Sequence, residues 1–107
     1  MEIRAVTCRE EELLTIIEHY GERNQVKKAI EELDELKERL EIYECSIDDY
    51  DTPELVVEEM ADVMIMVYQI MIIMNVDPNE LQSFIDYKLA RTFLRMRQEK
   101  KDGEDKK

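Results

Sequence analysis

The chain has 107 residues, only two glycines and two prolines, and a formal net charge of −12. This length fits one domain with a modest core, and the scarcity of Gly and Pro favours helices over a sheet-rich fold. Such an acidic chain is not expected to bind nucleic-acid polymers, because phosphate backbones attract basic surfaces. The two cysteines have no motif spacing, and the sequence shows no apolar signal core and no apolar run of membrane-spanning length. We therefore expect a cytoplasmic protein without membrane contacts.

Hydrophobic periodicity predicts four helices. Gly21 suits the residue that follows the first helix, and Asn24 can cap the second. Pro53 and Pro78 suit the first positions of the third and fourth helices, where a missing amide hydrogen costs little. The expected helices span residues 9–20, 24–43, 53–75 and 78–100.

Short connections between long helices predict an all-α, antiparallel four-helix bundle. Residues 1–100 are expected to form this single domain, and residues 101–107 a disordered charged tail. The second helix carries a stripe expected to be buried, and residues 63–74 of the third are apolar on nearly every face. A second subunit would cover that third helix, so we expect a homo-oligomer. The alternative is a central helix wrapped by the other three.

Two acidic clusters lie on the second and third expected helices, Glu31-Glu32-x-x-Glu35 and Glu58-Glu59-x-x-Asp62. At 100° per residue, Glu32 and Glu35 lie on a flank beside the apolar stripe. Glu59 and Asp62 are neighbours on one helix face. If the helices pack by their stripes, the carboxylates expected to meet are Glu32, Glu35, Glu59 and Asp62.

Carboxylates at close range repel one another, and a hard divalent cation removes this conflict. Oxygen ligands alone suit Mg²⁺, with Mn²⁺ as a substitute. His19 is the single histidine, which argues against a zinc site or a histidine-containing di-iron site. The alternative is a solvated helix face with ion pairs such as Glu35 with Arg39. Asp62 weighs against that alternative because it adjoins Val63 and Met64, where an unpaired carboxylate is costly.

Lys88, Arg91 and Arg95 share one flank of the fourth expected helix. A basic flank of this kind, together with metal-binding carboxylates, would suit a polyphosphate group. The alternative is that these cations pair with surplus acidic residues or with the helix C-terminus.

The two clusters together resemble the EExxE…ExxD signature of the MazG-type all-α nucleoside triphosphate pyrophosphohydrolases. In this chain Lys28 precedes Glu31-Glu32-x-x-Glu35, and 23 residues separate Glu35 from Glu59-x-x-Asp62. The resemblance covers roughly residues 25–96. It implies a MazG-like bundle that is a dimer or tetramer and that hydrolyses a nucleoside triphosphate, with Mg²⁺, to the monophosphate and pyrophosphate. Clearing of the nucleotide pool would be its role.

The resemblance also implies roles for individual residues. Glu31 would bind a second metal or orient the attacking water, and either Glu31 or Glu35 would accept its proton. The implied metal ligands are Glu32, Glu35, Glu59 and Asp62. The implied phosphate-binding residues are Lys28, Lys88, Arg91 and Arg95.

Two other functions compete with this interpretation. The chain could be a non-catalytic helical interaction module, in which the acids are solvated and the apolar helix is a dimer contact. The same fold could also act as a phosphoribosyl-ATP pyrophosphohydrolase or a dUTPase-like enzyme, since no base-reading motif separates these substrates.

Overall fold

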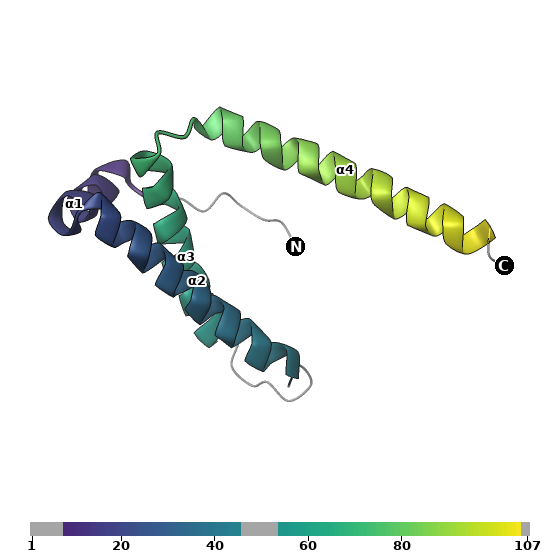
Figure 1. The fold of residues 1–107 in the computed structure, drawn as a ribbon, viewed down its shortest axis with the longest axis horizontal. Coiled ribbons are helices and arrows are strands. Elements are labelled where there is room, and N and C mark those ends of the chain that lie inside the picture. Colours follow the sequence, from purple (N-terminus) through teal and green to yellow (C-terminus); the bar gives the residue numbers. More distant parts are fainter. Residues whose placement is uncertain (1–7, 46–53, 106–107) are drawn as a thin grey trace. The chain divides into compact units, whose positions relative to one another are not determined.

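The structure is a computed structural model that describes residues 8–45 and 54–105. All regular secondary structure within these ranges is helical, which confirms the all-α class and the four expected helices (Figure 1). The expected start of the third helix at Pro53 lies outside the described residues. The chain divides into two compact units, residues 1–75 and 76–107. The helices are α1 (Glu10–Tyr20), α2 (Glu22–Cys45), α3 (Glu54–Ile73) and α4 (Pro78–Asp105).

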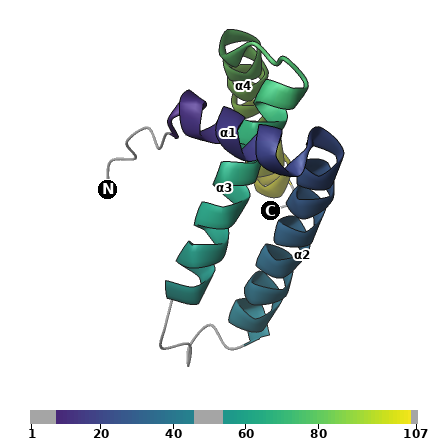
Figure 2. The same ribbon diagram turned by 90° about the vertical axis from the view of Figure 1, so that its left-hand side faces the viewer.

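In the first unit, α2 and α3 lie side by side and run in opposite directions (Figures 1 and 2). α1 crosses the end of this pair at which α2 begins and α3 ends (Figure 2). All three helices contact one another. The apolar core they enclose is small and consists of Leu13, Ile17, Ala29, Val63 and Met66.

Gly21 makes the sharp connection between α1 and α2. Its φ of 90° lies in the region that side chains disfavour, and its amide donates to the Ile17 carbonyl at 2.8 Å. The expected cap at Asn24 is wrong. α2 begins at Glu22, because the Gly21 carbonyl already accepts the first helical hydrogen bond. The Asn24 side chain instead donates to the Tyr20 carbonyl at 2.8 Å and so satisfies the end of α1.

The face that α2 buries differs from the expected apolar stripe. Its buried residues are Gln25, Ala29 and Glu32, at positions i, i+4 and i+7. Leu33 and Leu40 are exposed, and the expectation that the whole stripe is buried is therefore wrong for the single chain. The stripe stays outside because an amide and a carboxylate occupy the contact with α3.

The apolar helix α3 is also only partly covered by α1 and α2. Val63, Met66 and Gln69 are buried, whereas Ile65 and Val67 remain exposed. The sequence predicts that α3 is buried on all sides, and this would require a further surface to cover the part that α1 and α2 leave exposed. None of the four described helices is both long and apolar enough to cross a bilayer.

The second unit contains α4. It begins at Pro78, as expected, and the Asp77 carboxylate caps it by accepting from the Asn79 amide at 2.9 Å. α4 continues to Asp105 rather than ending near residue 100. The described helix therefore includes residues 101–105 of the charged tail. This segment has no proline to stop the helix, and Gln98 donates to Asp102 one turn later at 3.0 Å.

Candidate metal centre

Carboxylates from α2 and α3 meet at the contact between these helices. Glu32 comes from α2, and Glu59 and Asp62 come from successive turns of α3. One oxygen from each residue lies within 4.8 Å of the other two. Glu32 is buried, Glu59 is half-buried and Asp62 is exposed, so the group is open to solvent on one side. The structure thus brings together three of the four residues expected to bind metal.

This donor set fits a hard divalent cation. The Oε2 atoms of Glu32 and Glu59 are buried and have no hydrogen-bond partner among the described residues. A buried carboxylate oxygen without a partner is costly, and a cation would satisfy both at once. Mg²⁺ prefers oxygen ligands, so Glu32, Glu59 and Asp62 would hold such a cation.

Glu35, the fourth expected ligand, borders this group. Hydrogen bonding to Glu32 and the charge of Glu32 raise the pKa of Glu35, and Glu59 contributes in the same direction. Because its pKa is raised, the Glu35 carboxyl holds a proton more readily than an ordinary glutamate does. Glu35 and Glu59 also line an open pocket of about 400 Å³ with Glu38, Arg39 and Ile42.

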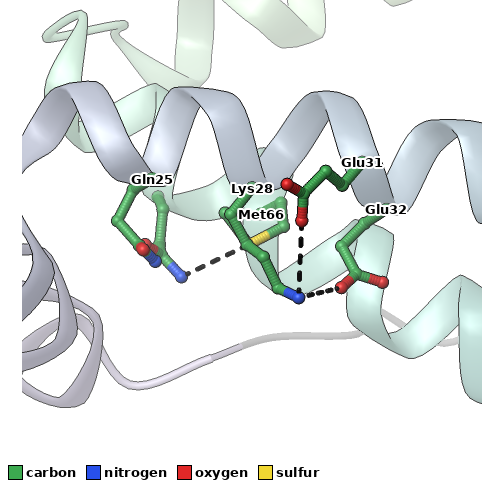
Figure 3. A network of polar contacts seen from close by, with 6 residues as sticks. Gln25, Lys28, Glu31, Glu32 and Met66 are labelled. Carbon is green, nitrogen blue, oxygen red and sulfur yellow. Dashed lines mark hydrogen bonds and ion pairs between the residues drawn. The ribbon is translucent and has the colours of Figure 1, made fainter.

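Lys28 is the cation next to the carboxylates. Its Nζ lies 2.9 Å from Oε1 of Glu32 and 3.9 Å from Oε2 of Glu31 (Figure 3). The hydrogen bond and charge of Glu32 raise the pKa of Lys28. Glu31 is exposed and pairs with Lys28 rather than joining the three-carboxylate group. Its expected part in binding a second metal or orienting water stays a prediction.

The three expected phosphate-binding residues of the fourth helix lie on α4. Lys88, Arg91 and Arg95 are exposed, and the Arg91 guanidinium lies over the Tyr87 ring at 5.7 Å from its centroid. Their spacing places them on one flank of the helix. α4 belongs to the second unit, so their approach to the carboxylates stays a prediction.

Sequence reasoning missed a buried amide pair beside the site. Gln25 of α2 donates through Nε2 to Oε1 of Gln69 of α3 at 2.7 Å. Gln69 is the lone polar residue in the apolar run from 63 to 74, which was the available signal. Nothing in the sequence around Gln25 distinguished it from a surface residue at a helix start.

The chain matched no protein-family model, no curated protein and no solved structure.

Proposed function

We propose that this chain is a Mg²⁺-dependent nucleoside triphosphate pyrophosphohydrolase. One observation carries the proposal: Glu32, Glu59 and Asp62 converge from two helices, with two buried carboxylate oxygens that have no partner among the described residues. The resemblance of the two acidic clusters to the MazG-type signature supports the same chemistry. Glu32, Glu59 and Asp62 would hold the cation, and Glu35 would complete the set from the rim.

The chain's own residues divide the remaining work. When bound, Mg²⁺ would polarise the phosphoryl oxygens and make the attacking water more acidic. Glu35 would accept the proton from that water as it attacks the α-phosphorus, because its carboxylate borders the proposed metal ligands. Lys28 would leave Glu32 and pair with a phosphate oxygen. The products are the nucleoside monophosphate and pyrophosphate.

Further phosphate contacts would come from the basic flank of α4, made of Lys88, Arg91 and Arg95. In so acidic a chain, a polyanionic substrate needs such a local group of cations to offset repulsion. We propose that the fold is an antiparallel four-helix, MazG-like bundle that oligomerisation completes. That arrangement would place cations around the departing pyrophosphate.

The proposed enzyme is a homodimer or homotetramer. Leu33 of α2 and Val67 of α3 are 53% and 39% exposed. Burying such apolar surface against a second copy would stabilise the assembly by roughly 25 cal/mol per Å² before association costs. Cys8 and Cys45 form no disulfide, which suits the reducing cytoplasm proposed as its location.

The test is a panel of nucleoside triphosphates and diphosphates, including dUTP, and phosphoribosyl-ATP, assayed with Mg²⁺. We expect pyrophosphate, rather than orthophosphate, from at least one triphosphate, and loss of that product in Asp62→Asn. Asp34→Asn is the matched control, because Asp34 is an exposed carboxylate of α2 outside the cluster. Unchanged pyrophosphate release by a folded Asp62→Asn protein would refute the site, and no pyrophosphate from any substrate would refute the activity.

A further inference from the structure

The buried amide pair occupies an unusual position in the core. Gln69 is 1% exposed and Gln25 is 6% exposed, so neither side chain can reach a ligand in solvent. The Gln25 amide donates to Gln69 at 2.7 Å, and the Gln69 amide makes a second, weaker contact with Sδ of Met66 at 3.7 Å. Two amides in so small a core need a reason, because apolar side chains of the same shape would be equally stable there.

The pair stands in fixed register with the carboxylates. Because α2 and α3 are antiparallel, each step forward from Gln25 along α2 matches an equal step back from Gln69 along α3. Seven residues, or two helical turns, after Gln25 is Glu32, and seven before Gln69 is Asp62. A single register therefore joins the amides at one level and brings Glu32 to Asp62 at the other.

The same register also matches the remaining two carboxylates. Ten residues after Gln25 is Glu35, and ten before Gln69 is Glu59. Glu35 and Glu59 line the same pocket, which is consistent with this pairing.

Apolar packing alone gives this register little support. Between Gln25 and Glu32, the one buried residue of α2 is Ala29, whose methyl group offers little shape to interlock with α3. The carboxylates oppose the register, because the like charges of Glu32, Glu59 and Asp62 repel one another in the absence of a cation. A directional hydrogen bond two turns away resists that repulsion, since sliding either helix would leave a buried amide without a partner.

We propose that the Gln25–Gln69 hydrogen bond fixes the register of α2 against α3 and thereby positions Glu32 against Glu59 and Asp62. Gln25 and Gln69 are positioning residues that act through the helices. The metal-site part of this inference rests on the proposed function, whereas the register itself does not. A buried polar group that selects one register at little gain in stability is a known device in paired helices.

The test replaces the amides by methionine, which keeps their length and shape. Gln25→Met and Gln69→Met each leave one buried amide without its hydrogen-bond partner, so each should lower the melting temperature. The double variant removes both amides and should melt at or above the temperature of the unaltered chain. It should nevertheless bind Mg²⁺ at least tenfold more weakly by calorimetry. Met66→Leu, at the same helix contact, is the control and should bind Mg²⁺ within twofold of the unaltered chain.

Register is measured without metal. Spin labels at the exposed residues Lys37 and Glu58, with Cys8 and Cys45 changed to Ser, report the distance between α2 and α3. We expect one narrow distance in the unaltered chain and Met66→Leu. The double methionine variant should show a broadened or second distance, because a slip of one turn moves one label by about 5.4 Å along the axis.

The outcomes separate the two proposals. An unchanged spin-label distance in the double variant would refute the proposal that the amide hydrogen bond fixes the register, whatever happens to Mg²⁺ binding. A changed spin-label distance with unchanged Mg²⁺ affinity would refute the proposal that this register positions the metal-binding carboxylates. If the unaltered chain binds no Mg²⁺, the proposed function fails, and the spin-label distances alone decide whether the amide pair sets the register.

Discussion

Replacing Glu32 by glutamine should raise the stability of the metal-free protein and abolish its response to Mg²⁺. Glu32 is the buried member of the three-carboxylate group, and its Oε2 has no partner among the described residues. The substitution keeps the size of the side chain and removes its charge. It also removes the ion pair with Lys28 at 2.9 Å, which acts in the opposite direction.

The balance of these effects follows from the geometry. Two unit charges 4.8 Å apart, the largest separation in the group, repel by roughly 3.5 kcal/mol at an effective dielectric constant of about 20. That value applies to Glu32 with half-buried Glu59. The exposed Asp62 is screened by water, for which about 0.9 kcal/mol is appropriate. The lost ion pair is worth about 1 kcal/mol at most, because Lys28 is half exposed. We expect a net gain of about 1–3 kcal/mol without metal.

Mg²⁺ should make the unaltered chain more stable than Glu32→Gln. At a concentration 1,000 times its dissociation constant, the cation stabilises the unaltered chain by about 4.1 kcal/mol, which exceeds the expected advantage of Glu32→Gln. For a domain of this size, 1 kcal/mol changes the melting temperature by about 4–8 °C. Thermal unfolding followed by circular dichroism, with and without Mg²⁺, therefore resolves both effects. Asp34→Asn is the control and should respond to Mg²⁺ as the unaltered chain does.

One result would refute this reasoning. If Glu32→Gln is less stable than the unaltered chain without metal, yet gains as much from Mg²⁺, the carboxylates neither repel strongly nor hold the cation. The acidic face would then be a solvated surface with ordinary ion pairs.

Two further predictions concern the rim of the site and the assembly. The folded-state pKa of Glu35 lies above its ordinary value of 4.5, so the stability from protonated Glu35 is complete below that pH and is lost as pH rises through the raised pKa. Glu35→Gln should flatten this decline in metal-free melting temperatures as the pH rises above 4.5. An equally steep decline in the variant would show that Glu35 is not its cause. Leu33→Asp should reduce the assembly to monomers in light scattering while Leu33→Met does not, and equal masses would exclude that face of α2 from the subunit contact.

Local chemistry explains why most helix boundaries were predictable. Gly21 ends α1 because its positive φ is one that other residues resist, and Pro78 opens α4 because its missing amide hydrogen costs nothing there. The boundaries that failed depend on competition between neighbours. The Asn24 side chain could cap α2 or hydrogen-bond the last carbonyls of α1, and in the structure it donates to the Tyr20 carbonyl of α1.

The site was predictable for a different reason. Glu59 and Asp62, three apart on one helix, share a face whatever the rest of the chain does. Which face of α2 they meet depends on tertiary packing, and the apolar stripe through Leu33 pointed to the wrong one. Burial of Gln25 and Glu32 against α3 overrides hydrophobic periodicity here, and no periodicity reveals that in advance.

The equal spacing of the two acidic clusters acquires a physical meaning in the antiparallel pair. Glu32 and Glu35 are three apart in the forward direction, and Asp62 and Glu59 are three apart in reverse. Because both helices rise 1.5 Å per residue, equal spacing lets both pairs face each other in one register, and unequal spacing would satisfy only one.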